Sequence, residues 1–259
     1  MNVTGLPLVN VEAELFRLLF LMTRIGAALL AAPIFGAMSV PVQLRLVLTG
    51  AIAIFVAVWV PVATPSALLS LAGLLALLGE VVIGLAFGFV LQLSFAAPVI
   101  AAEIIAGGMG VAMATAVDPN TGGQSGALGQ YFTLLLTLIF LGLGCHLLWL
   151  RLLIESYAAM PPGTAWLGAE QAVRIAGFAA EMFATAIAIA LPVTLALLLV
   201  QILTGVLSRS APALNLFSLG LPAGVLAGIT ALIAAFPLLT EQFLDLSAAA
   251  IEHVGMIAR

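Results

Sequence analysis

The chain has 259 residues, of which 64% are hydrophobic and 7% carry a charge. Soluble domains contain about 45–50% apolar and roughly 25% charged residues, so this chain has too little polar side chain to cover a water-facing globule. Its net charge is −4 and its basic residues form no run or stripe, so we expect no nucleic-acid partner.

Long intervals without charge indicate where the helices lie. A membrane-spanning helix needs about 20 mostly apolar residues, and most intervals between formal charges reach or approach that length. No strand pattern appears in the sequence. It therefore predicts an all-α membrane protein of about six to seven long, kinked apolar helices arranged as helical hairpins. The predicted helices cover residues 11–32, 42–60, 65–95, 98–117, 128–157, 169–207 and 216–246.

Turn-forming residues separate these helices. Residues 118–126 are the most polar stretch of the chain, and we expect a loop there. Pro192 should bend the helix over 169–207. The residues after 246 are predicted to form a frayed amphipathic end. The arginines do not fix an orientation in the membrane, because they fall on both sides of any arrangement of the helices.

A stripe of small residues and one acid follows one face of the helix over 65–95. Glu80, Gly84 and Gly88 recur at helical spacing, and two glycines four residues apart let helix backbones approach closely. One interpretation is a tight helix contact with a protonated or hydrogen-bonded glutamate. The other is an ion or proton site, because acids inside membranes are costly and often functional.

Two further patterns favour helix packing. Arg17 and Arg24 lie on one helical face, and Glu14 is placed to pair with Arg17, which predicts an ion pair at a helix–helix interface. Gly220, Gly224 and Gly228 form a second ladder of small residues, which also favours close packing.

The most unusual segment is 106–114, which is rich in glycine and methionine. Gly107, Gly108 and Gly110 each weaken a helix by roughly 1 kcal/mol relative to alanine, so a break or flexible loop is expected. Met109 and Met113 supply flexible apolar side chains. The segment is either a connector with apolar anchors or a deformable seal that lines a pore.

The sequence contains no pattern for catalysis. It has no nucleophilic triad, phosphate-binding loop or redox motif. Cys145 and His146 are adjacent, but further metal ligands at suitable spacing are missing, and a buried free thiol is the simpler interpretation. We therefore expect a protein that is not an enzyme, with no cofactor and no metal.

Short motifs in a fixed order over roughly 200 residues resemble the FliR family of type III export gates, in both its flagellar and injectisome branches. The matching positions are Arg24, Pro33, Gly36, Pro41, Arg45, Gly79, Glu80, Gly84, Gly88, Gly107, Met109, Gly110, Asp118, Pro119, Gly144, His146, Ser156, Pro161, Gly163, Arg209, Pro212, Asn215, Phe217, Gly220 and Pro222.

The resemblance implies a function and a set of partners. A FliP-like portion over residues 1–185 would precede a FliQ-like hairpin and tail over 186–259. Homologues of FliP and FliQ would join the chain in a hetero-oligomeric ring, and a homologue of FlhB would wrap the closed gate. Unfolded export substrates would pass through the centre. The assembly would sit in the bacterial inner membrane, in the flagellar basal body, with part of it on the periplasmic side.

The resemblance also implies residue roles. Residues 107–110, Met113, Asp118 and Pro119 would plug the closed channel. Arg24, Arg45, Glu80, Gly84, Gly88, Arg209, Pro212, Asn215, Phe217 and Gly220 would serve helix packing and assembly. Three alternatives stay open: the injectisome counterpart of the gate, a secondary transporter that uses Glu80, Glu103 or Arg24, and a purely structural scaffold.

Overall fold

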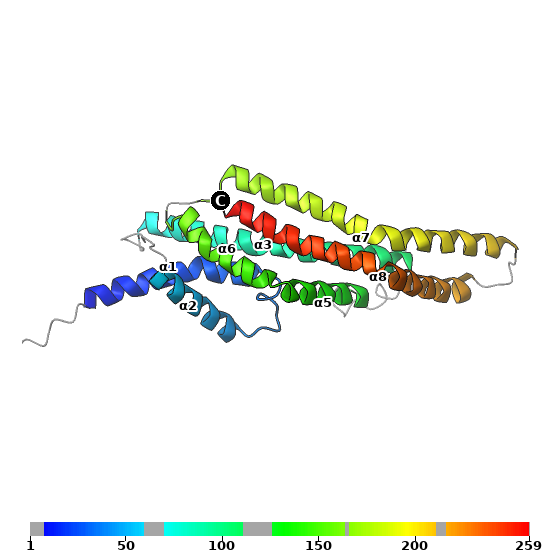
Figure 1. The fold of residues 1–259 in the computed structure, drawn as a ribbon, viewed down its shortest axis with the longest axis horizontal. Coiled ribbons are helices and arrows are strands. Elements are labelled where there is room, and N and C mark those ends of the chain that lie inside the picture. Colours follow the sequence, from blue (N-terminus) through cyan, green and yellow to red (C-terminus); the bar gives the residue numbers. More distant parts are fainter. Residues whose placement is uncertain (1–7, 60–69, 111–125, 164–165, 211–215, 259) are drawn as a thin grey trace, which may run out of the picture. The chain divides into compact units, whose positions relative to one another are not determined.

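The computed structural model describes residues 8–59, 70–110, 126–163, 166–210 and 216–258. This part of the chain is all-α, as the composition predicts, and it contains no strand. Its helices are α1 (Leu8–Ala31), α2 (Val42–Trp59), α3 (Leu71–Gly108), α5 (Ala127–Gly142), α6 (Cys145–Ala159), α7 (Ala169–Ser210) and α8 (Leu216–Ile257) (Figure 1).

The chain folds as two compact units. The first contains residues 1–92, 144–178 and 250–259, and the second contains residues 93–143 and 179–249. Helices α3, α7 and α8 each contribute to both units. The predicted division into a FliP-like portion over 1–185 and a FliQ-like hairpin over 186–259 is a division along the sequence and does not follow these two units. It stays a prediction.

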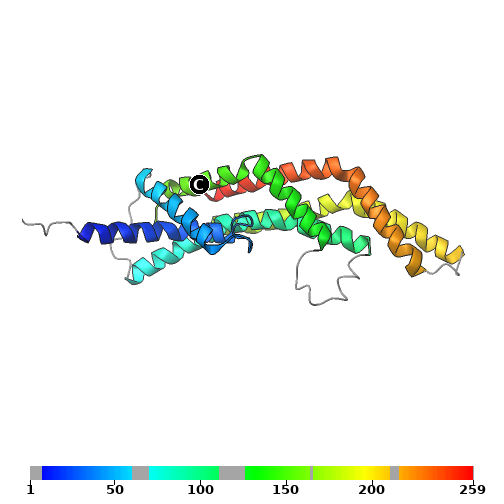
Figure 2. The same cartoon turned by 90° about the horizontal axis from the view of Figure 1, so that it is seen from below.

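In the first unit, α1 and α2 form a hairpin (Figure 2). The turn between them is tied by Arg45, whose guanidinium donates to the carbonyl oxygens of Gly36, Ala37 and Val40. The predicted ion pair at this interface is present: Arg17 lies 3.6 Å from Glu14 and also donates to the carbonyl oxygen of Ala57 on α2. Polar side chains of α1 and α2 thus use backbone carbonyls as partners.

Aromatic contacts join the other helices within each unit. In the first unit the indole N–H of Trp149 on α6 donates to the carbonyl oxygen of Phe87 on α3 at 3.1 Å. In the second unit, Phe132 on α5 lies edge-on against Phe243 on α8, with ring centroids 5.6 Å apart. Edge-to-face rings of this kind contribute beyond the area that they bury.

Two predicted helix boundaries were wrong. The chain was expected to break between residues 95 and 98, but α3 continues through Pro98 to Gly108. Where no water is available, free backbone groups are costly, so the chain gives up one hydrogen bond at proline and stays helical. The single helix predicted over 128–157 is instead the bent pair α5 and α6, because Gly144 takes a left-handed φ of 72°.

The predicted frayed end was also wrong. Helix α8 continues to Ile257 instead of ending near residue 246. Val254 and Ile257 are buried, and His253 stacks on Phe178 of α7 with ring centroids 4.1 Å apart. Apolar burial therefore holds these last turns in the helix.

Several described helices are long and apolar enough to cross a membrane. Four qualify among the described residues, over Val42–Trp59, Leu71–Gly108, Ala169–Leu207 and Gly220–Ile257, and the bent pair of α5 and α6 makes up to five. Many of their large apolar side chains are exposed, as in the α7 stretch that contains Leu199, Leu203 and Val206. Such surface needs lipid or a protein partner to cover it.

Candidate functional sites: a buried ion pair and the end of helix α3

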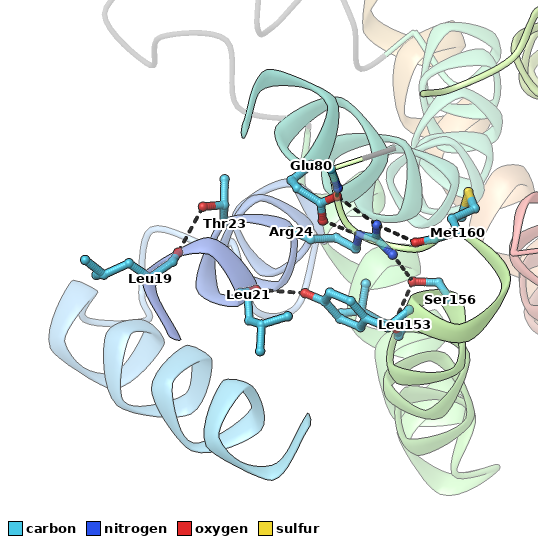
Figure 3. Close-up of polar contacts among 10 residues, drawn as sticks. Leu19, Leu21, Thr23, Arg24, Glu80, Leu153, Ser156 and Met160 are labelled. Atoms are coloured by element: carbon cyan, nitrogen blue, oxygen red, sulfur yellow. Dashed lines mark hydrogen bonds and ion pairs between the residues drawn. The ribbon is translucent and has the colours of Figure 1, made fainter. Parts of the chain in front are cut away.

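A buried ion pair lies in the first unit (Figure 3). The guanidinium of Arg24 on α1 donates to both carboxylate oxygens of Glu80 on α3, at 2.7 and 3.0 Å. It also donates to the hydroxyl of Ser156 on α6 and to the carbonyl oxygen of Met160. Both charged side chains have no solvent exposure. A two-point pair with further hydrogen bonds meets the main demand of burying charge, which is that every polar atom finds a partner.

The turn after α6 completes this site. Met160 supplies its carbonyl oxygen to Arg24, and the backbone N–H of Gly163 donates to Glu80 at 3.3 Å. Gly163 has a φ of 83°, a conformation that favours glycine. Tyr157, on the last turn of α6, places its ring 4.3 Å from the Arg24 guanidinium. Three helices and one turn therefore meet at a single cation.

The glycine stripe of α3 lies directly beside this pair. A β-carbon at Gly84 would lie 2.9 Å from that of Ala27, and one at Gly88 would lie 2.5 Å from that of Ala31, closer than real β-carbons approach. Glycine at these two positions lets α3 pack against the backbone of α1. The tight helix contact is therefore real, and it lies four and eight residues after Glu80 on the same face of α3.

The end of α3 is the second candidate site, and it lies in the second unit. The helix ends at Gly108, and Gly110 turns the chain with a φ of 79°. A cavity of about 250 Å³ opens here, lined by residues 107–110, α7 and α8. The Met109 side chain is buried. The glycine–methionine segment is thus helical as far as Gly108, whereas we expected a break or loop from residue 106.

Glu103 has a structural partner in the same unit. Its carboxylate accepts a hydrogen bond of 3.1 Å from the backbone N–H of Gly126, which is the N-cap residue of α5. The first N–H groups of a helix lack partners within the helix, and a negative charge there is favourable. Glu103 therefore caps the start of α5 from the end of α3.

Comparison with known proteins places the chain. Residues 15–250 match the family described as bacterial export proteins, family 1. The chain is 31% identical to the flagellar biosynthetic protein FliR of Escherichia coli K12 over 218 residues. The aligned region covers 84% of this chain and 83% of that protein. The chain belongs to the FliR family. This confirms the resemblance inferred from the ordered motifs.

Two further members of the FliR family give the same result. The FliR protein of Aquifex aeolicus is 30% identical over 232 residues, which cover 90% of each chain. The FliR protein of Bacillus subtilis is 31% identical over 209 residues, which cover 79% of this chain and 80% of the relative. The family is one of export proteins, and the similarity extends over nearly the whole chain.

The other residues singled out by the FliR resemblance are placed as follows. Arg45 ties the turn between α1 and α2, and Arg209 is exposed in the last turn of α7. Phe217 lies in the first turn of α8, and Gly220 lines the cavity at the end of α3. Met113, Asp118, Pro119, Pro212 and Asn215 lie outside the described residues.

Sequence reasoning missed several residues of these sites. Gln201 on α7 donates its amide N–H to the carbonyl oxygen of Gly108 at 2.9 Å, and nothing in the local sequence distinguished it. The pairing of Arg24 with Glu80 was also missed, although both residues were selected. A signal existed: neither residue has an opposite charge three or four positions away, so a distant partner was required.

No metal-binding cluster appears in the part of the chain that the structure describes. No group of three or more histidine, cysteine or acidic side chains is placed to hold a metal ion there. Cys145 is a free, buried thiol, in agreement with the simpler interpretation from sequence. The two candidate sites are therefore built from packing, hydrogen bonds and one ion pair.

Proposed function

We propose that this chain is a non-enzymatic core subunit of the flagellar type III protein export gate. In this proposal, residues 107–110, with Met113, Asp118 and Pro119 after them, help to seal the conduit for unfolded substrates. The observation that carries the proposal is the end of α3 in a member of the FliR family: an apolar helix that stops at glycines, with Met109 packed beside a cavity.

The chemistry of this segment suits a seal. Methionine is flexible and fills irregular gaps, and an apolar constriction blocks ions by excluding water. Glycines permit the backbone to change conformation at low steric cost. A segment of this kind can close the empty conduit, deform while a substrate chain passes, and close the conduit again afterwards. A rigid ring of charged side chains would not do this.

The exposed apolar surface supports assembly with other membrane proteins. We infer homologues of FliP and FliQ as ring partners and a homologue of FlhB at the closed gate, in the bacterial inner membrane and the flagellar basal body. Part of the assembly would lie on the periplasmic side. The FliP-like portion over 1–185 and the FliQ-like hairpin over 186–259 belong to this proposal, as does a role of Arg209, Pro212, Asn215 and Phe217 in assembly.

No observation favours the transporter alternative. The Glu80 carboxylate is already bound by the Arg24 guanidinium and the Gly163 N–H, and Glu103 caps α5. A carboxylate that carries protons or ions must exchange its partners during each cycle, whereas these two have structural ones. Similarity to flagellar relatives likewise gives no reason to prefer the injectisome counterpart.

Purification of the tagged chain from its native membrane tests the proposal. Mass spectrometry of the purified material should identify FliP and FliQ homologues in a single complex with the chain. The same tag on an unrelated inner-membrane protein is the control for carry-over. Recovery of the chain as a homo-oligomer without those partners, from cells that assemble flagella, would overturn the proposal.

A further inference from the structure

Met109 is seated against two glycines of α8. A β-carbon at Gly228 would lie 2.5 Å from Cγ and 2.8 Å from Sδ of Met109, so the methionine side chain occupies the space that any larger residue would need. A β-carbon at Gly224 would lie 3.0 Å from the Met109 carbonyl oxygen. Side chain and backbone of the same residue thus use consecutive turns of α8.

Met109 packs against two of the three glycines in the α8 ladder and leaves the third without a contact. Gly220, Gly224 and Gly228 share one helical face at four-residue spacing. A β-carbon at Gly220 would meet nothing within 4 Å. Each glycine inside a helix costs roughly 1 kcal/mol relative to alanine. The close contact with Met109 explains why glycine stands at 224 and 228 despite that cost. Gly220 makes no such contact and therefore provides a matched control position.

A side chain of α7 also binds the end of α3. The Gln201 amide donates to the carbonyl oxygen of Gly108, the residue before Met109, at 2.9 Å. The last carbonyls of a helix have no partner within the helix, so this oxygen is available to a side-chain donor. The end of α3 is therefore held twice, by a hydrogen bond from α7 and by side-chain packing on α8.

We propose that Gly224, Gly228 and Gln201 form a seat that positions Met109, and that the gate opens only when Met109 leaves this seat. The inference rests on the proposed function, because the seat has a purpose only if the end of α3 belongs to the seal. Gln201 and the two glycines are positioning residues: they act through Met109. One hydrogen bond and one side-chain contact are weak enough to be broken and re-formed during each passage.

A disulfide tests the seat directly. Met109 Cβ is one carbon–carbon bond of about 1.5 Å from Cγ, so β-carbons at positions 109 and 228 would lie within about 4 Å, inside the range of roughly 3.5–4.5 Å seen in disulfides. The experiment combines Met109→Cys with Gly228→Cys in a Cys145→Ala background, in the full complex in its membrane. The control pairs Met109→Cys with Gly220→Cys, about 12 Å further along α8.

Oxidation should cross-link the 109–228 pair and leave the 109–220 pair unlinked. In cells, the cross-link should abolish export of flagellar substrates, and a reductant should restore it, whereas a purely structural contact would leave export unchanged. Two outcomes overturn the inference: equal cross-linking of both pairs, or unimpaired export by a fully cross-linked gate. Neither outcome affects the partners found by purification, so failure of the seat and failure of the proposed function are distinguishable.

Gly228→Ala provides a measurement without cysteines. Alanine at this position displaces the Met109 side chain, so the complex should become permeable to small ions. The complex with Gly220→Ala should stay impermeable. Intact assembly of both variants is verified by the recovery of their partners. A tight, assembled Gly228→Ala complex would contradict the seat.

Discussion

Arg24 and Glu80 are 56 positions apart in the sequence and form a two-point ion pair of 2.7 and 3.0 Å with no solvent exposure. The pair joins α1 to α3 at the point where Gly84 brings the two backbones together. Ser156 and Met160 bind the same guanidinium. Charge, hydrogen bonding and close packing thus fix one junction of the first unit.

Removal of either charge should destabilise the protein strongly. Arg24→Met leaves the Glu80 carboxylate buried without its cation, and breaking a buried pair in this way costs about 3–5 kcal/mol. We expect little folded protein in the membrane. Arg174→Met is the control, because Arg174 pairs with Glu170 at an exposed position, where ion pairs contribute little. The measurement is the thermal midpoint of the detergent-solubilised chain together with its level in the membrane.

The double variant Arg24→Met with Glu80→Met should lose less than the two single variants combined. Two apolar residues leave no uncompensated charge behind, and such replacements of buried pairs are often tolerated. Strict additivity of the two single effects would argue against the ion pair as the source of the coupling.

The close approach of α1 and α3 should tolerate no larger residue at Gly88. Gly88→Val places a branched side chain against Ala31, where even a β-carbon would lie at 2.5 Å, and forced overpacking costs about 1–3 kcal/mol. Gly177→Ala in α7 is the control, because a β-carbon there meets nothing within 4 Å. We expect a lower thermal midpoint for Gly88→Val and an unchanged or higher one for Gly177→Ala; equal shifts would contradict the contact.

Tyr157→Phe isolates one buried hydrogen bond. The Tyr157 hydroxyl donates to the carbonyl oxygen of Leu21 at 2.7 Å, and loss of such a bond costs about 0.5–1.5 kcal/mol. Tyr131 is half exposed and provides the matched change, Tyr131→Phe. The thermal midpoint should fall for Tyr157→Phe and stay constant for Tyr131→Phe. If both variants are as stable as the unchanged chain, the hydroxyl adds nothing.

Glu103→Ala should expose the start of α5. The Gly126 N–H loses its carboxylate acceptor, so its amide hydrogen should exchange faster, while Glu241→Ala, at an exposed position of α8, should leave that rate unchanged. Flagellar export should survive Glu103→Gln, which keeps an oxygen acceptor. Complete loss of export in Glu103→Gln would show that export requires the charge of this carboxylate and not only its hydrogen bond, which would contradict a purely structural role.

Composition and charge spacing predicted the helices well, because apolar length is the main signal in a chain of this kind. They failed at single proline and glycine residues, each of which can either break a helix or stay within it. Pro98 stays inside α3 because its neighbours remain helical, whereas Gly144 ends α5 because its backbone takes a left-handed conformation. The type of residue alone does not distinguish these cases.

The candidate sites were predicted in part. Glu80, Gly84 and Gly88 were selected from their shared helical face, and the glycine–methionine segment from its composition. The partner of Glu80 and the role of Gln201 depend on contacts between helices far apart in the sequence, 56 positions for one and 93 for the other. A pattern within one helix carries no information about such partners.

The proposed sealing role of residues 107–113 is tested most directly by ion conductance. Deletion of residues 107–113 removes Met109 and the glycines around it. The complex that this variant forms with its proposed partners, the FliP and FliQ homologues, is reconstituted in a lipid bilayer beside the complex of the complete chain. We predict that the deleted complex conducts small ions while the complete one stays closed. Assembled complexes of equal, low conductance would contradict the account.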